Sequence, residues 1–260
     1  VIFPISLEYI GDQSFVQCYS LNNVKLYSNV AYIGSEAFYG CEDLYDVYNE
    51  GKVSLVAGSR DNGYAARYAV KVHTDMNEAS SVEISINNIG TFRRSGGSWL
   101  LIKGASTKNV NLSTFKYGDT TVKSYRVAEN AFANNNTIET LIVSDAVEQI
   151  QLNAFSNCSN LKSIDFASNK SIREIEENTF SYCSRLRFAY LPDTVEKIGE
   201  SAFYSCTMLE EIDMPTSLET IAGYAFYDCG RLISVTLYGN VISIGDGAFY
   251  SCDHLLEVIN

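Results

Sequence analysis

The sequence has few of the residues on which metal binding and acid–base catalysis depend. Among its 260 residues there are two histidines, His73 and His254, and no pair of cysteines separated by two residues. Zinc sites need several Cys or His ligands at short, regular spacings. Neither histidine lies beside a candidate nucleophile, and the Ser-Gly-Gly-Ser turn at residues 95–98 lacks the strand-to-helix setting of a phosphate-binding loop. We therefore predict no catalytic residues, no metal site and no cofactor.

The sequence also lacks a long apolar run and a basic block. It contains no stretch of about 18 consecutive apolar residues, so we predict no membrane span. The net charge is −12 and the 19 Lys and Arg residues are dispersed, which argues against a nucleic-acid partner. The chain starts at Val1 without a methionine or a signal peptide, and we interpret it as a segment of a longer protein.

The sequence does contain one pattern that is repeated many times. The stretch "IGESAFYSCTMLEEIDMP", residues 198–215, recurs in eight copies that align on a phenylalanine. Successive copies are 23 residues apart, except for one step of 25 and one gap of 94. A fixed period of this length is typical of a solenoid, in which each unit buries its apolar face only by stacking on its neighbours. The aligned phenylalanines are Phe15, Phe38, Phe132, Phe155, Phe180, Phe203, Phe226 and Phe249.

Each copy can be read as one coil of chain that contains a short strand. Ile164 and Phe166 lie nine and eleven residues after Phe155, and polar residues alternate with them, so one set of side chains faces inward and the other outward. Strands that recur once per coil must run parallel. A second short extended piece precedes the next copy. The "xxAFxxC" section between them is too short for three helical turns, so we predict a single helical or 3-10 turn there.

All seven cysteines lie three residues after a repeat phenylalanine. The copy at Phe132 has Asn135 in this place, and so does without a thiol. An odd number of cysteines at one equivalent position is typical of small side chains that fill a slot in the stack. We predict free, buried thiols, and disulfides between adjacent coils are the alternative.

This pattern resembles a leucine-rich repeat, and closely resembles the BspA-like subgroup, whose unit reads roughly I-G-x-x-A-F-x-x-C-x-x-L-x-x-I-x-L-P. The resemblance covers eight units, in residues 1–49 and 123–260. It implies an α/β fold, namely a right-handed leucine-rich repeat solenoid with a parallel strand and a short helical or 3-10 turn in each repeat of about 23 residues. The turn after the strand has no Asn, so the Asn ladder of the generic leucine-rich repeat is absent.

Residues 50–122 lack the Phe and Cys marks of the repeat. There we predict a strand, a short helix in "GYAARYAVKV" at residues 63–72, a hairpin around residues 95–98, and a repeat-like strand at Asn109. We interpret this region as an irregular spacer or cap that is continuous with the solenoid. It separates an array of two repeats, residues 1–49, from an array of six, residues 123–260. Degenerate coils through the gap, or two arrays that meet at an angle, are the alternatives.

The outward side chains on the concave sheet of a solenoid form a matrix that can bind a ligand. Phe188 and Tyr190 place two outward aromatic rings on one strand, and Asp165, Glu211 and Asp213 flank them. Exposed aromatic residues with charged neighbours fit a binding hot spot, so these five residues are the candidate ligand-binding residues. The alternative is that aromatic residues simply suit strands and stack across neighbouring rungs. A separate tyrosine column, which we expect to cover the edge of the coil, consists of Tyr39, Tyr204, Tyr227 and Tyr250.

The resemblance to BspA-like proteins implies a protein that is not an enzyme and that binds macromolecules, as in adhesion. It implies an extracellular or cell-surface location and an extracellular protein or glycan as the partner. We expect a monomer. The alternatives are a structural spacer or stalk that presents another domain, and an accessory region of a larger secreted enzyme.

Overall fold

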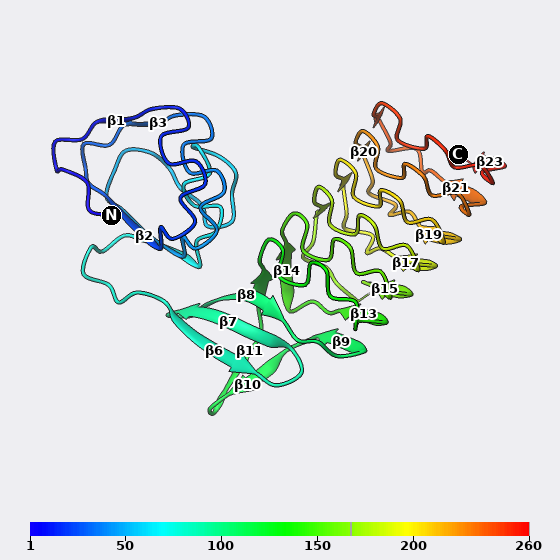
Figure 1. Cartoon of the computed structure of the whole chain (residues 1–260), viewed down its shortest axis with the longest axis horizontal. Coiled ribbons are helices and arrows are strands. Elements are labelled where there is room, and N and C mark those ends of the chain that lie inside the picture. The colour runs from blue at the N-terminus through cyan, green and yellow to red at the C-terminus, as the bar shows by residue number, and fades with distance from the viewer. Residues whose placement is uncertain (167, 260) are drawn as a thin grey trace. The chain divides into compact units, whose positions relative to one another are not determined.

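A computed structural model describes residues 1–166 and 168–259, and the chain divides into two compact units. Unit 1 comprises Val1–Ile84 and Arg93–Leu100, and unit 2 comprises Ser85–Phe92 and the chain from Leu101 onward. Every regular element of the described residues is a β-strand (Figure 1).

Unit 1 contains two small parallel sheets formed by successive coils. One sheet has the order β2-β4-β5 and the other pairs β1 with β3. The strands are β1 (Tyr9–Ile10), β2 (Asn23–Leu26), β3 (Tyr32–Ile33), β4 (Asp46–Asn49) and β5 (Lys71–His73).

A second group of strands follows, in which a five-stranded sheet contains both hairpin strands and the first strands of the second array. The sheet order is β14-β12-β8-β7-β6, and β10 pairs with β11 in a separate antiparallel ribbon. These strands are β6 (Val82–Ile86), β7 (Gly90–Ser95), β8 (Ser98–Gly104), β10 (Phe115–Tyr117), β11 (Thr120–Val122), β12 (Tyr125–Val127) and β14 (Val147–Ile150).

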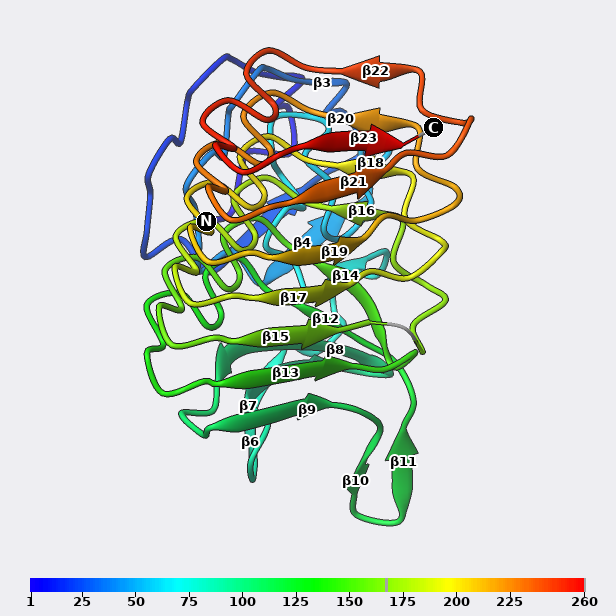
Figure 2. The same cartoon turned by 90° about the vertical axis from the view of Figure 1, so that its right-hand side faces the viewer.

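The main array of unit 2 has one long and one short strand in each coil. The long strands follow one another in the order β9-β13-β15-β17-β19, with β21 and β23 paired after them, as Figure 2 shows. The short strands form a second parallel sheet, β16-β18-β20-β22. Their bounds are β9 (Asn109–Leu112), β13 (Thr140–Val143), β15 (Ser163–Asp165), β16 (Glu174–Ile175), β17 (Phe188–Tyr190), β18 (Lys197–Ile198), β19 (Glu211–Asp213), β20 (Thr220–Ile221), β21 (Ser234–Thr236), β22 (Ser243–Ile244) and β23 (Glu257–Ile259).

The repeat pattern sets the register of these strands. Ile164 of β15 lies opposite Ala189 of β17, which lies opposite Ile212 of β19. Each of these residues is nine positions after its repeat Phe, and all three are buried. A one-residue slip would turn them outward, so burial on the inner face holds the register. The predicted solenoid of stacked parallel strands is therefore confirmed.

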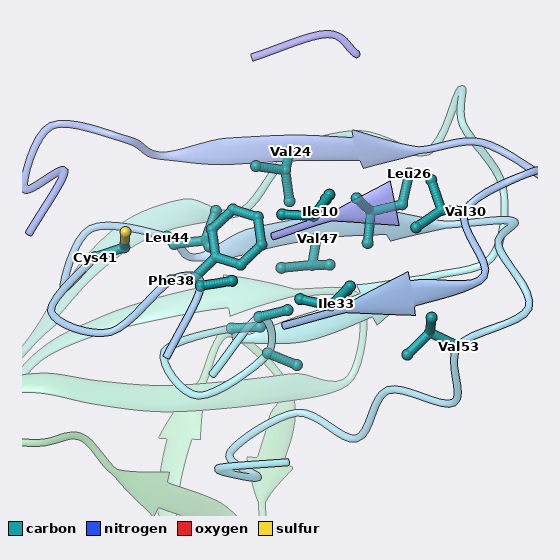
Figure 3. Packing of buried hydrophobic residues seen from close by; sticks show 14 of the residues in the cluster. Ile10, Val24, Leu26, Val30, Ile33, Phe38, Cys41, Leu44, Val47 and Val53 are labelled. Atoms are coloured by element: carbon teal, nitrogen blue, oxygen red, sulfur yellow. The ribbon is translucent and has the colours of Figure 1, made fainter. Parts of the chain in front are cut away.

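The repeat phenylalanines form a ladder through the core. Phe203 is fully buried, and its ring stacks on Phe180 at a centroid distance of 5.5 Å and on Phe226 at 5.2 Å. Unit 1 has the same arrangement, with Phe38 packed among aliphatic side chains such as Val24 and Val47 (Figure 3). Phe and Leu side chains that point inward from every coil thus give each unit a continuous apolar core.

The turn that carries each phenylalanine is not helical, and the prediction of a helical or 3-10 turn is wrong. Ser201 and Ser205, two residues either side of Phe203, have left-handed backbone with φ of 53° and 52°. Such residues at alternate positions interrupt a right-handed helix. The N–H groups of Ser201, Phe203 and Ser205 instead donate to carbonyl oxygens of the next coil at 2.8–3.0 Å. The fold of the described residues is consequently all-β rather than α/β.

The predicted helix at residues 63–72 is also absent. Asn62, Gly63 and Tyr64 have positive φ values of 48°, 63° and 64°, which exclude a right-handed helix at its start. The chain turns here and then forms β5, which pairs in parallel with β4. The N–H of Phe38 donates to the Gly63 carbonyl at 2.7 Å, in the way that one repeat turn bonds to the next.

Two other predictions for this region are confirmed. Strands β7 and β8 are neighbours joined by a turn at Gly96 and Gly97, which is the predicted hairpin. Strand β9 at Asn109 pairs in parallel with β13. The β10–β11 ribbon was not predicted, because its short alternating runs were read only as a lengthened return of the chain.

Candidate binding face

The five candidate residues lie together on the outer face of three adjacent strands of unit 2. Phe188 is paired with Glu211, and Tyr190 lies between Asp165 on β15 and Asp213 on β19. Both aromatic side chains are half-buried, and the three carboxylates are exposed. Parallel strands are about 4.8 Å apart, so each ring is within reach of the acidic side chain opposite it. The structure therefore brings the predicted set together as one surface, which we call the β17 face.

Arg187, which the sequence analysis did not single out, shapes one end of this face. Its guanidinium carbon lies 5.1 Å from the centre of the Phe188 ring. It also donates from Nη2 and Nε to the two carboxylate oxygens of Glu210, at 2.8 Å and 3.2 Å. The Arg187 guanidinium, with a smaller contribution from Arg231, holds the pKa of Glu210 below its usual range. Arg187 was missed because only the outward columns of the strand were considered, and it lies just before the strand.

A second ion-pair cluster lies at the same position in the earlier coils. Glu139 accepts from Lys162 at 2.7 Å and from Lys108 at 3.1 Å. These lysines hold the pKa of Glu139 below its usual range. Exposed ion pairs of this kind contribute little to stability. They do hold the basic side chains beside the face in contact with acidic side chains of the same chain. The basic side chains next to the strands are thus largely compensated within the chain.

In unit 1 the equivalent face is covered by the chain itself. Residues 74–81, which we call the strap, follow β5 and fold back over β2 and β4. Lys25 donates to the Met76 carbonyl at 2.7 Å, and the Tyr48 hydroxyl donates to the Glu78 carbonyl at 3.1 Å. Tyr48 is only 3% exposed as a result. The repeat pattern predicted outward side chains here, and it contained no signal for the strap.

The strap is held by a buried polar cluster around His73. Asp46 lies 3.0 Å from His73 Nε2 and accepts bonds from the backbone N–H and the hydroxyl of Ser81 at 2.9 Å. Glu78 Oε2 lies 3.1 Å from His73 Nδ1, and Lys71 also contacts Glu78. The ammonium of Lys71 and the ring of His73 hold the pKa of the Glu78 carboxyl below its usual range.

This cluster contains Ser, His and Asp, but it is not arranged as a catalytic triad. The Ser81 hydroxyl donates to the Asp46 carboxylate rather than to the imidazole. Both ring nitrogens of His73 face carboxylates, and the ring is fully buried. A triad requires a nucleophile hydrogen-bonded to the base and accessible to substrate. The cluster therefore fixes the strap and offers no general base for a reaction.

The cysteines are free, and five of them are buried. The Cys206 thiol donates to the carbonyl oxygen of Phe180, which is the repeat phenylalanine of the preceding coil, at 3.2 Å. Asn135 occupies the same position and donates to Ala105 O at 3.1 Å, so an amide replaces the thiol as donor. Burial raises the pKa of Cys158 to about 12. A thiol that stays protonated is a poor nucleophile.

The burial of the thiols departs from the prediction at the two ends of the repeat series. Cys18 is exposed and Cys252 is partly exposed, whereas the prediction was that all seven are buried. The reason is packing, because these cysteines belong to the first and last copies of the repeat, where only one neighbouring coil covers them.

Three members of the tyrosine column, all in unit 2, stack on one another. The rings of Tyr204 and Tyr227 are 4.7 Å apart and nearly parallel, and Tyr227 and Tyr250 are 5.2 Å apart. Tyr227 is thus stacked on both faces, whereas Tyr250 has one stacked neighbour and stays 62% exposed. Tyr39, in unit 1, makes an edge contact with Tyr64 instead.

Within residues 1–166 and 168–259, no group of three or more His, Cys, Asp or Glu side chains is placed to hold a metal ion. That same part of the chain contains no helix that is long and apolar enough to cross a membrane.

Comparison with known proteins confirms the resemblance seen in the repeat. Residues 1–57 and 125–256 match the family described as BspA type Leucine rich repeat region, in six copies. No curated protein matches the chain.

Two solved bacterial structures with TM-scores above 0.5 share the fold, and a third has a lower score. A leucine-rich repeat protein from Bacteroides ovatus is 23% identical over 99% of this chain and 60% of its own, with a TM-score of 0.51. The pneumococcal vaccine antigen PcpA is 21% identical over 69% of this chain and 49% of its own, with a TM-score of 0.54. A leucine-rich cell surface protein from Faecalibacterium prausnitzii is 20% identical over 98% of this chain and 52% of its own, with a TM-score of 0.44. The chain thus spans between about half and three fifths of the length of these proteins.

Proposed function

Because the chain belongs to the BspA-type leucine-rich repeat family, we propose that it is a non-catalytic module, secreted or at the cell surface, that binds a macromolecule through the β17 face. The observation that carries the proposal is the state of the two strand faces. The face of unit 1 is covered by the strap, whereas Phe188 and Tyr190 in unit 2 are left half-exposed on adjacent outward positions. Aromatic side chains are typical anchors of an interface.

Removal of the two anchors tests the proposal. We expect the double variant Phe188→Ala with Tyr190→Ala to weaken binding by at least about 2 kcal/mol while the fold is kept, because both side chains point away from the core. Biolayer interferometry against a panel of purified extracellular-matrix proteins and microbial surface glycans measures the change. Circular dichroism confirms that the variant is folded.

The matched control removes two aromatic rings elsewhere in unit 2. Tyr182 and Tyr250 are 52% and 62% exposed and lie on the turn edge, away from the strand face. The double variant Tyr182→Ala with Tyr250→Ala should bind as the parent does. If the Phe188 and Tyr190 double variant also binds as the parent does, the face is not the binding site, and the chain acts as a spacer or as an accessory region.

A further inference from the structure

The strap of unit 1 is attached to the strands beneath it by polar contacts. Residues 74–81 form no strand, and their two apolar side chains, Met76 and Ala79, are not buried. Among the described residues, no backbone hydrogen bond joins the strap to β2, β4 or β5. Segments with few buried apolar contacts are the ones that open locally at low cost. Whether the strap covers the face therefore depends on the polar groups that hold it.

His73 is the group among these whose charge can change near neutral pH. Histidine is the side chain that ordinarily gains or loses its charge between pH 5 and 8. The ring of His73 is fully buried, and it stacks on Tyr48 at a centroid distance of 4.4 Å. Nε2 lies 3.0 Å from Oδ1 of Asp46 on β4, and Nδ1 lies 3.1 Å from Oε2 of Glu78 in the strap. Only a ring with a proton on both nitrogens suits two carboxylates.

The two carboxylates would respond differently to the loss of one proton. The Asp46 side chain is 7% exposed and that of Glu78 is 33% exposed, so the remaining N–H is needed more by Asp46. The described residues provide no hydrogen-bond partner for Nδ1, so its contact with Glu78 is an attraction between charges. A neutral ring would instead direct the Nδ1 lone pair toward this carboxylate. Glu78 keeps its charge, because the Lys71 ammonium and the His73 ring hold the pKa of its carboxyl below the usual range.

The other charged groups around the ring complete the balance. Lys71 on β5 contacts Glu78, and Lys25 on β2 lies over the Tyr48 ring at 4.9 Å while it donates to the strap carbonyl of Met76. Lys71 and a protonated His73 together match the two negative charges of Asp46 and Glu78. With a neutral ring, one of the two carboxylates loses its counter-charge. Movement of Glu78 into water relieves that cost, whereas Asp46 is fixed on its strand.

We infer that the strap is a pH-dependent cover, closed over the strand face of unit 1 while His73 carries a proton on both ring nitrogens and released as the pH rises and the ring becomes neutral. Release uncovers Tyr48, whose outward position on β4 is equivalent to that of Tyr190 on β17. The inference concerns unit 1 and does not depend on binding at the β17 face.

Nuclear magnetic resonance of the histidine rings tests the inference. The chain has two histidines, so labelling with ¹³C at Cε1 gives two signals, and the one that is lost in His254→Gln belongs to the exposed His254. Between pH 5.5 and 8.5 the chemical shift reports the protonation of each ring, and a neutral gadolinium chelate broadens the signal of any ring that it can approach. We expect the broadening of His73 to rise at least threefold at the pH where its shift changes. The broadening of His254 should stay constant.

Glu78→Gln identifies the group that responds to the proton. This variant removes the charge that His73 attracts, so the broadening of His73 should no longer change with pH. The matched control is Glu42→Gln, which removes the same charge from an exposed position of unit 1 and should behave as the parent does.

Four results would overturn the inference. The His73 signal could neither shift nor broaden across the range, or it could shift while its broadening stays the same. Glu78→Gln could release the strap at the same pH as the parent. Finally, circular dichroism could show that strand structure is lost together with the protection of His73, in which case unit 1 unfolds and the strap does not open by itself.

Discussion

Replacement of Phe203 by alanine tests whether the phenylalanine ladder holds the coils together. Phe203 is fully buried, and its ring stacks on Phe180 and Phe226 with interplanar angles of 18° and 5°. Truncation of a buried Phe to Ala costs about 3–5 kcal/mol, including the cavity that remains. Each lost ring pair accounts for about 0.5–1.5 kcal/mol, and the core cannot collapse where rings on both sides hold their places. We therefore expect a loss of about 4 kcal/mol.

The assay must allow for unfolding that is not all-or-none, since repeat proteins can lose coils separately. Urea unfolding measures the overall loss of free energy of unfolding. Hydrogen exchange of the amides around Phe180 and Phe226 shows which coils are destabilised. Phe249→Ala is the matched control, because Phe249 is only half-buried and stacks on Phe226 alone among the ladder rings. We expect it to cost about half as much. A loss below about 1 kcal/mol for Phe203→Ala, or equal losses for both variants, would refute the ladder as the main source of stability.

Two predictions concern the thiols. Titration of the native protein should find a fast-reacting Cys18, a slower Cys252 and five thiols that react only after unfolding, and a total below seven in the unfolded, unreduced protein would reveal disulfides. Stability should fall above about pH 9, because burial raises the pKa of Cys41 and Cys252 to about 11 and that of Cys158 to about 12, from a usual value of 9.0. Above pH 9 the unfolded state loses these thiol protons while the folded state keeps them. The contribution of the thiols to the free energy of unfolding is therefore complete below pH 9 and is lost as the pH rises through 11–12, at up to about 1.4 kcal/mol per pH unit for each thiol. Urea unfolding at pH 8–10.5 should show a shallower decline for Cys158→Ala than for the parent, and identical slopes would contradict this account.

The strands and the core could be predicted because both follow from spacing. A residue nine positions after the repeat Phe is buried in every coil but the last, whose Val258 is 55% exposed; Ile164, Ala189 and Ile212 are examples. The same spacing placed Phe188 and Tyr190 outward. Period-two alternation and stacking at a fixed period have one solution for such a chain, so no tertiary information was needed.

The turn conformation was missed although the sequence contains a signal for it. The positions two residues before and after each Phe hold Asn, Ser, Gly, Asp, Gln, Glu or Tyr, and never a β-branched residue. β-Branched side chains are the ones that left-handed backbone tolerates least. The length of the section suggested a helical turn, but residues such as Asn153 and Asn157 favour left-handed φ, which directs their N–H groups to the next coil.

Arg187 and the strap could not be predicted from the repeat, because neither is part of it. A repeat pattern determines which side chains point outward from the sheet, but it does not determine which other segments of the chain cover those side chains. Tyr48 and Tyr190 occupy equivalent outward positions, yet the strap buries Tyr48 while Tyr190 stays half-exposed. The difference arises from residues 74–81, which lie between the arrays and follow no period.

This contrast restricts the proposed binding surface to fewer positions than the repeat pattern does. If every coil offered an equivalent face, affinity would be spread along the array and no single strand would matter. Among the described residues, a paired set of outward aromatic residues, Phe188 and Tyr190, coincides with an open face only in unit 2. Under the proposed function, selectivity depends on a few positions of one strand and its neighbours, so substitutions at β17 and β19 should change the partner while the fold stays the same.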